Sequence, residues 1–295
     1  MPTPRHLTRL LTALALLVSP ALTAAPLLTT GESVAFLGDS ITFQGARYAG
    51  GYVRLVESGL HANGIEITVI PAGIARNTAP DMLARLDKDV LAKKPVWMTL
   101  SCGVNDVNMR VSLEDYQRDI TTIVDRAQAA GIKVVIFTAT LVGETLDSSA
   151  RNRNTRAVPY NAFLRQLATS RNLPLADLNA DMQAALAARK AAGSARELEL
   201  TVDGVHMNQA GNLIMARGVL RAFGLDDAQL AKAEAAWKAI PDLVPVTAAA
   251  ALSLEENDQL IALTNGNPDA YLNTRFTQFL KAELEAARTA SKSTP

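Results

Sequence analysis

The residue types that could carry out chemistry gather in four short segments, at positions 38–40, 73, 103–106 and 203–206. Ser40 offers a hydroxyl nucleophile, and the His206 imidazole is the kind of side chain that acts as a general base at neutral pH. Asp203 precedes His206 by three residues, across a glycine, so its carboxylate can curl back and orient the ring. These types predict nucleophilic catalysis by Ser40, with His206 as base and Asp203 as its partner.

Each segment also has a purely structural interpretation. Asp39 and Ser40 could simply cap a helix, and Gly73 could be an ordinary turn glycine. Asn105 and Asp106 could bond the backbone of their own turn, a role that we expect for Asp106. The last segment could be an Asx turn followed by a surface histidine.

Other nucleophiles, bases and metal ligands are scarce in the sequence. Beyond the first 25 residues the histidines are His61 and His206, and His61 lies in a helical segment where we expect a capping or surface role. No ligand spacing supports a metal site, so we expect no metal. Cys102 is the one cysteine, which excludes an intramolecular disulfide. It ends the apolar run 96–101 and is expected to be buried rather than reactive.

Short apolar runs alternate with longer amphipathic ones. The predicted strands are 33–37, 65–70, 95–101, 133–139 and, more weakly, 173–178. The predicted helices are 51–62, 79–92, 113–130, 158–171, 181–192 and 209–223. This alternation predicts an α/β fold, in which a parallel sheet is covered by helices on both faces and ligands bind at the carboxyl ends of the strands.

Taken in order, the motifs Gly38-Asp39-Ser40, Gly73, Gly103-Val104-Asn105-Asp106 and Asp203-Gly204-Val205-His206 resemble the four sequence blocks of the SGNH, or GDSL-type, hydrolases. The resemblance covers residues 33–223. It implies a three-layer αβα sandwich with flavodoxin-like strand order. It also implies a triad of Ser40, Asp203 and His206, and an oxyanion hole made by the amides of Ser40 and Gly73 with the Asn105 side chain.

The second block departs from the family pattern. Pro71 and Ala72 stand where an Asn often precedes the glycine, and Arg76 and Asn77 stand where a second glycine is frequent. The Gly-x-Ser-x-Gly signature of the larger α/β-hydrolase fold is absent around Ser40, because Thr42 occupies its last position.

The two ends of the chain differ from the middle. A basic start, an apolar run at 10–18 and small residues at 23–25 predict a signal peptide over 1–25 and a periplasmic or secreted protein. A retained N-terminal anchor is the alternative. We expect a hydrolase domain over 26–225 and a helical C-terminal extension over 226–295, with an amphipathic helix at 271–287. That extension is expected to pack on the core, with a lid or an oligomerisation element as alternatives.

The overall charge points to no polyanionic partner. Lys and Arg number 29 and Asp and Glu number 29, so the formal net charge is +0. We expect no nucleic acid and no stable membrane insertion after signal removal, and the oligomeric state stays open. The chemistry requires no cofactor.

The expected substrate is a small-molecule or polysaccharide ester with a short acyl group, such as acetyl on carbohydrate. The segment 144–159 carries Arg151, Arg153 and Arg156, which would border the pocket and contact a carboxylate or acidic sugar, unless the loop is simply solvated. The alternatives are an O-acyltransferase, a lipase- or thioesterase-like enzyme, and a non-catalytic carbohydrate-binding protein.

Overall fold

The structure is a computed structural model. It describes residues 25–144, 153–194, 196–240, 254–264 and 268–292. The expected signal peptide therefore lies outside the described residues. The chain divides into two compact units at Val244, and each unit is described by itself.

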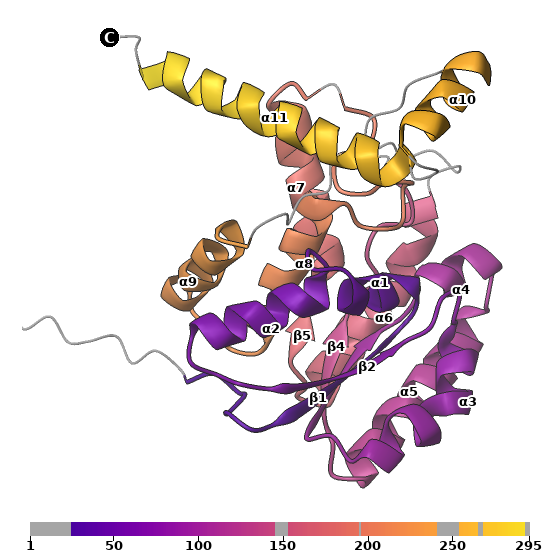
Figure 1. Cartoon of the computed structure of the whole chain (residues 1–295). Coiled ribbons are helices and arrows are strands. Elements are labelled where there is room, and N and C mark those ends of the chain that lie inside the picture. The colour runs from indigo at the N-terminus through magenta and orange to yellow at the C-terminus, as the bar shows by residue number, and fades with distance from the viewer. Residues whose placement is uncertain (1–24, 145–152, 195, 241–253, 265–267, 293–295) are drawn as a thin grey trace, which may run out of the picture. The chain divides into compact units, whose positions relative to one another are not determined.

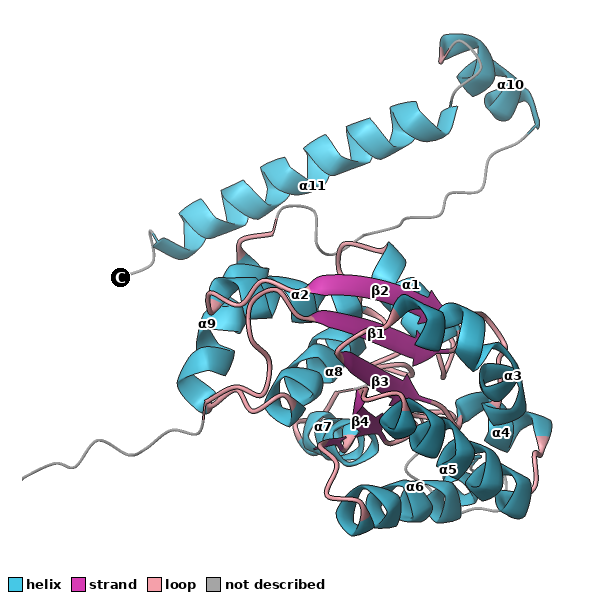
Figure 2. Ribbon diagram, turned by 90° about the horizontal axis from the view of Figure 1, so that it is seen from below, coloured by secondary structure: helices cyan, strands magenta, loops and turns pink. Residues whose placement is uncertain are grey.

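In the described part of the first unit, five parallel strands form one sheet (Figures 1 and 2). The strands are β1 (Ser33–Gly38), β2 (Thr68–Gly73), β3 (Trp97–Ser101), β4 (Lys133–Phe137) and β5 (Leu175–Ala176). Their order is β2-β1-β3-β4-β5, which confirms the predicted parallel sheet and the flavodoxin-like order. β1 and β3 are neighbours, so the segments that follow them emerge side by side at the carboxyl edge.

Helices cover both faces of this sheet, which gives the three layers that the resemblance implied (Figure 2). One layer holds α1 (Ser40–Arg47), α2 (Tyr52–Ala62), α7 (Leu178–Ala191), α8 (Gln209–Ala222) and α9 (Asp227–Lys238). The other holds α3 (Ala79–Asp89), α5 (Leu113–Ala129) and α6 (Arg153–Ser170), with the short η1 (Leu91–Lys93) and α4 (Val104–Met109) in the loops.

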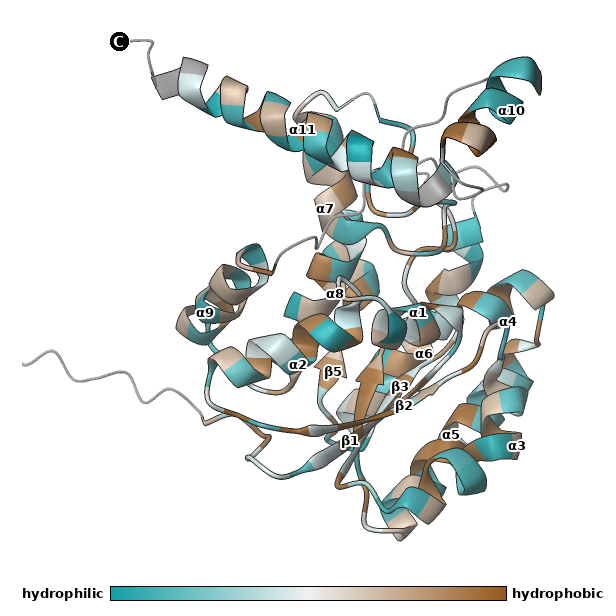
Figure 3. Cartoon of the chain, viewed as in Figure 1, coloured by the Kyte–Doolittle hydropathy of each residue, from teal (hydrophilic) through white to brown (hydrophobic). Residues whose placement is uncertain are grey.

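The strands are apolar on both sides because both sides are covered. β1 and β3 are almost wholly buried, and the strands are mainly brown in the hydropathy colouring of Figure 3. On one face the Tyr52 ring of α2 packs edge-on against Phe36 of β1 and Phe137 of β4. Its hydroxyl lies 2.9 Å from Thr42 Oγ1, so this apolar core also holds α1 in place.

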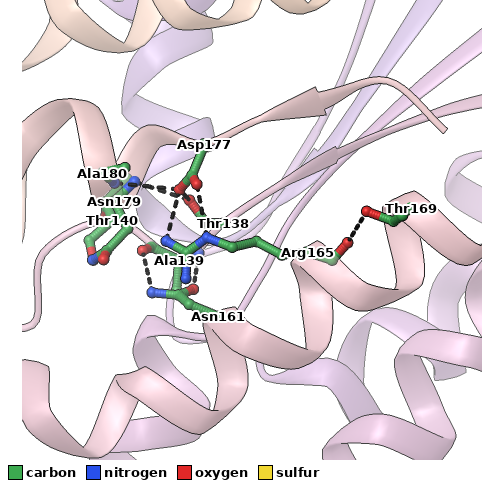
Figure 4. A network of polar contacts seen from close by, with 9 residues as sticks. All are labelled: Thr138, Ala139, Thr140, Asn161, Arg165, Thr169, Asp177, Asn179 and Ala180. Carbon is green, nitrogen blue, oxygen red and sulfur yellow. Dashed lines mark hydrogen bonds and ion pairs between the residues drawn. The ribbon is translucent and has the colours of Figure 1, made fainter.

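A polar network fixes the helices that follow β4 and β5 (Figure 4). Arg165 of α6 donates to both carboxylate oxygens of Asp177, at 2.7 and 2.9 Å. Asp177 caps α7 and also accepts from the Thr138 hydroxyl at 3.1 Å. Asn161 bonds the backbone N–H and C=O of Ala139. The chain leaving β4 is therefore held to α6 and α7 before it reaches residue 144.

The structure differs from the sequence-based expectation in five elements. α6 begins at Arg153, five residues earlier than predicted, and Pro159 lies inside it. β5 is two residues long, and β2 begins at Thr68 rather than 65. The short helices α1 and α4 were not predicted, since neither is long enough to show a clear period.

The helix α9 packs as part of the first unit, although the expected domain boundary at residue 225 precedes it. Leu230, Ala233 and Trp237 are buried against α2 and α8, and Trp237 Nε1 donates to Leu55 O at 2.8 Å. The second unit contains α10 (Leu254–Leu263) and α11 (Pro268–Lys292), and α11 includes the predicted helix 271–287.

Replacing Trp237 tests whether α9 belongs to the core. Trp237→Ala should lower the free energy of unfolding by about 3–5 kcal/mol, because it removes a buried ring together with the hydrogen bond from its indole N–H to Leu55 O. Val158→Ala is the control, since Val158 is 60% exposed and its loss should change stability by less than about 0.5 kcal/mol. Urea titrations would measure both, and equal small changes would show that α9 contributes nothing to the core.

Candidate active site

Ser40 is the first residue of α1, directly after the carboxyl end of β1. Asp39 is the N-cap, and its side chain accepts from Ile41 N at 2.9 Å. The first bond of the helix backbone runs from Phe43 N to Asp39 O, so the helix offers no acceptor to the N–H of Ser40. The Ser40 amide is thus free to bind a substrate oxygen beside its own hydroxyl. Asp39 therefore does cap this helix, but the Ser40 hydroxyl contacts a residue of another element, His206.

The Ser40 hydroxyl lies 2.8 Å from His206 Nε2, across 166 residues of chain. On the other side of the ring, His206 Nδ1 lies 2.7 Å from Asp203 Oδ2. If Nδ1 carries the proton that this carboxylate accepts, Nε2 is left as the acceptor for the serine hydroxyl. The structure therefore brings together the three side chains predicted to act as a unit.

A hairpin-like loop carries Asp203 and His206. Val202 N donates to His206 O at 2.8 Å, and Asn208 N donates to Leu200 O at 3.0 Å. The second oxygen of Asp203, Oδ1, accepts from the amides of Val205 and His206 at 3.0 and 2.7 Å. Asp203 thus fixes the loop with one oxygen and the imidazole with the other, as the spacing predicted.

The charge state of Asp203 suits this role. Partial burial raises the pKa of its carboxyl, but the bonds from the His206 ring and from two backbone amides outweigh burial and leave the pKa below its ordinary value. An ionised Asp203 can then stabilise the imidazolium that forms when His206 takes a proton.

Glu144 anchors the base of this loop from the chain that leaves β4. It is 9% exposed, and its carboxylate accepts from Glu199 N at 2.5 Å and from Leu200 N at 2.9 Å. Two backbone amides bonded to one buried carboxylate make a rigid attachment, because neither amide has water as a substitute partner.

Asn212 anchors the other end of the loop. Its side-chain oxygen accepts from Tyr52 N at 2.9 Å, and its amide donates to Asn208 O at 3.0 Å. Since Tyr52 begins α2, which follows α1 closely in the chain, this residue ties the histidine loop to the layer that carries Ser40. Glu144 at one end of the histidine loop and Asn212 at the other thus hold His206 at 2.8 Å from the Ser40 hydroxyl.

Asn105 follows β3 as the second residue of α4, next to Ser40 at the carboxyl edge. Its side-chain nitrogen donates to Asn77 O at 3.0 Å. An amide nitrogen carries two hydrogens, so one can hold the side chain while the other faces a substrate oxygen. The turn depends on Gly103, whose φ of 129° lies where L side chains are strained and whose missing Cβ would come within 2.8 Å of Ala139.

Asp106 was expected to bond only the backbone of its own turn. In the structure it also binds a neighbouring element. It is fully buried, and its Oδ1 accepts from Ala79 N, the first residue of α3, at 2.8 Å. Cys102 is buried, as predicted, and its thiol donates to Asp106 Oδ2 at 3.3 Å. Burial raises the pKa of the Cys102 thiol well above its ordinary value, and the Asp106 charge raises it further, which makes a nucleophilic role unfavourable.

Gly73 has a packing role in the structure. A Cβ there would lie 2.3 Å from Phe43 N, so the glycine lets α1 rest directly on β2. In β2 the amides of Thr68 and Ile74 donate toward β1, to Glu32 O and Gly38 O. Since N–H directions alternate along a strand, the N–H of Gly73 faces the outer edge of the sheet. The expected role of Gly73 as an oxyanion donor stays a prediction.

The arginines expected to border the pocket fall in different places. Arg151 lies outside the described residues. Arg153 and Arg156 are exposed on α6 rather than in a loop, and Arg153 Nη1 donates to Asn108 Oδ1 of α4 at 3.2 Å. His61 is exposed and pairs with Glu66, as expected of a surface residue. The described residues contain no group of three or more His, Cys, Asp or Glu side chains placed to hold a metal ion.

Some side chains that support the site carry no signal in the sequence, because their partners are backbone atoms far along the chain. They are Arg85, Glu144 and Asn212. Only the position of Glu144 after a predicted strand could have drawn attention to it.

The buried carboxyl of Asp39 predicts a pH dependence of stability. Burial raises its pKa from 3.8 to about 6 against the lowering effect of the bond from Ile41 N, and the charge of Asp106 raises it further. The folded state therefore keeps this proton to a higher pH than the unfolded state. As the pH rises from about 4 to about 6, the free energy of unfolding should fall.

Asp39→Asn keeps an oxygen for Ile41 N and lacks this titration. Between pH 4 and pH 7, the stability of the variant relative to wild type should rise by about 2–3 kcal/mol. Urea titrations across this pH range would measure the difference, and a stability difference that is constant with pH would refute the assignment.

Comparisons with known proteins agree with this geometry. Residues 36–214 match the model of the GDSL-like lipase/acylhydrolase family. An acetylxylan esterase of Geobacillus stearothermophilus is 30% identical over 220 residues, which cover 67% of this chain and 96% of the relative. The esterase TesA of Pseudomonas aeruginosa is 30% identical over 127 residues, 42% of this chain and 63% of the relative.

Solved structures give the same result. Axe2, an acetylxylan esterase from Geobacillus stearothermophilus, superposes with a TM-score of 0.59 at 27% identity over 68% of this chain and 97% of its own. The acetyl xylan esterase AlAXEase superposes with a TM-score of 0.58 at 32% identity over 64% of this chain and 98% of its own. The chain therefore belongs to the GDSL-like lipase/acylhydrolase family and is a carboxylic ester hydrolase.

Proposed function

We propose that the chain is an exported serine esterase that removes acetyl groups from carbohydrate esters, with Ser40, His206 and Asp203 as its catalytic triad. The observation that carries the proposal is the 2.8 Å contact between Ser40 Oγ and His206 Nε2, backed by the 2.7 Å contact to Asp203. No other pairing of nucleophile and base among the described residues has this arrangement, since His61 is exposed and pairs with Glu66.

In the proposed mechanism, Ser40 Oγ attacks the ester carbonyl while its proton passes to His206 Nε2. The oxyanion accepts bonds from the Ser40 amide, which the helix leaves free, and from the second hydrogen of the Asn105 side-chain amide. His206 then gives its proton to the leaving alcohol. Water, deprotonated by His206, releases the acid and restores Ser40.

The names of the relatives support the choice of substrate. Two of the esterases that this chain is similar to are described as acetylxylan esterases, and both are covered almost entirely by the match. None of the helices in the described ranges combines the length and apolarity required of a membrane-spanning segment. Export rests on the basic and apolar pattern of residues 1–25.

The first test compares wild type with Ser40→Ala. Wild type should release acetate from acetylated xylo-oligosaccharides and hydrolyse p-nitrophenyl acetate faster than the octanoate. Ser40→Ala should lower kcat by a factor on the order of 10⁴ or more, because it removes the hydroxyl that His206 contacts. Asn105→Ala should lower kcat by about 10²–10³.

Three outcomes would contradict the proposal. Equal turnover by wild type and Ser40→Ala would remove Ser40 as the nucleophile. A rate that rises with acyl chain length would favour a lipase-like enzyme, and transfer to an added sugar hydroxyl in excess of hydrolysis would favour an O-acyltransferase.

The Glu144 anchor predicts an effect on turnover at a distance from the substrate. Glu144→Ala leaves the amides of Glu199 and Leu200 without their acceptor, so the loop that carries Asp203 and His206 should lose its fixed position. We expect kcat for p-nitrophenyl acetate to fall by about tenfold to 10²-fold, with KM changed far less.

Glu234→Ala is the matched control, because it removes a carboxylate that pairs with Arg217 on the exposed surface of α8 and α9. It should leave kcat unchanged. If Glu144→Ala keeps full kcat while folding normally, the anchor does not position His206.

A further inference from the structure

Arg85 lies on α3 with its side chain 13% exposed, and it bonds two other segments and a residue of its own helix at once. Nη2 donates to Gly38 O at 2.9 Å, Nε donates to Asn77 Oδ1 at 2.6 Å, and Nη1 donates to Asp89 Oδ2 at 2.9 Å. Each nitrogen of the planar guanidinium is engaged. The group therefore fixes the relative positions of its partners, which a single point charge could not do.

Two of these partners belong to the elements that build the site. Gly38 ends β1 and stands two residues before Ser40. Asn77 belongs to the loop between β2 and α3, and its backbone oxygen accepts the bond from Asn105 Nδ2 at 3.0 Å. A continuous chain of hydrogen bonds thus begins at Gly38, in the turn that carries Ser40. It runs through the Arg85 guanidinium and Asn77 to the side chain of Asn105.

The third partner, Asp89, explains how the positive charge of Arg85 is stabilised in a largely buried position. Asp89 lies one helical turn after Arg85 on α3, at i+4, and its side chain is 21% exposed. It neutralises the guanidinium on the side away from Gly38 and Asn77. The other two bonds go to neutral oxygens, a backbone carbonyl and a side-chain amide.

We propose that Arg85 is a positioning residue for ester hydrolysis, which holds the Ser40 turn and the Asn105 side chain at the separation required to bind one substrate oxygen. The proposal rests on the proposed function, in which the Ser40 amide and the Asn105 side chain are the oxyanion donors. Arg85 acts through these two groups and does not itself touch the substrate.

The experiment severs this chain of bonds in two ways. Asn77→Ala removes only the bond from Arg85 Nε and keeps the backbone oxygen that holds Asn105. Arg85→Lys keeps the positive charge, but one ammonium group cannot reproduce the planar fork that reaches both Gly38 O and Asn77 Oδ1. Arg126→Lys is the matched control, because Arg126 pairs with Asp87 on the same helix α3 at an exposed site.

Steady-state kinetics with p-nitrophenyl acetate should show a fall in kcat of about tenfold for Asn77→Ala and for Arg85→Lys, with KM within about twofold of wild type. Arg126→Lys should match wild type. Thermal melts would show that the variants are folded at the assay temperature.

A double-mutant cycle separates positioning from a general loss of stability. If Arg85 works through Asn105, then Asn77→Ala or Arg85→Lys should lower kcat by less than about twofold once Asn105→Ala is present. Full multiplication of the losses, or unchanged kcat in both single variants, would overturn the proposal. Turnover that survives Ser40→Ala would instead mark the failure of the proposed function, on which this inference depends.

Discussion

The proposed chemistry depends on one hydrogen bond between residues that are 166 positions apart, from Ser40 Oγ to His206 Nε2. Neither side chain can set that distance itself, because each sits on a short turn that other contacts hold. A parallel sheet solves the problem by bringing the carboxyl ends of neighbouring strands to one edge, where β1 delivers Ser40 and β3 delivers Asn105. His206 arrives later, from a loop before α8, and needs separate anchors.

Those anchors share a physical logic. Backbone amides and carbonyls near the site are bonded by largely buried side chains whose own positions are fixed elsewhere: Glu144 holds the amides of 199 and 200, and Asn212 joins α8 to Tyr52. Asp106 holds the start of α3. Burying such carboxylates has a cost, which the raised pKa of Asp39 makes visible. Moving any one of these side chains away would leave a buried partner without its hydrogen bond, and this cost keeps the site in one geometry.

The sequence predicted the parts of this arrangement that depend on local pattern. Buried strands and their parallel order follow from apolar runs and from the family resemblance, and the proximity of Ser40, Asp203 and His206 follows from spacing and from the same resemblance. Arg85 and Glu144 were not predicted, because a helical arginine and a loop glutamate look like surface residues until their distant backbone partners are known. The packing role of Gly73 was not predicted either, because the backbone that approaches it, at Phe43, belongs to α1, a helix that shows no clear period in the sequence.

The central claim is that Ser40 is activated by His206, and covalent labelling tests it most directly. Wild-type protein would be treated with a fluorophosphonate, and the label located by mass spectrometry of its peptides. We predict one label per chain, on Ser40, formed at least about 10² times more slowly in His206→Ala. A label on another residue, or an equal rate of Ser40 labelling without His206, would contradict the account.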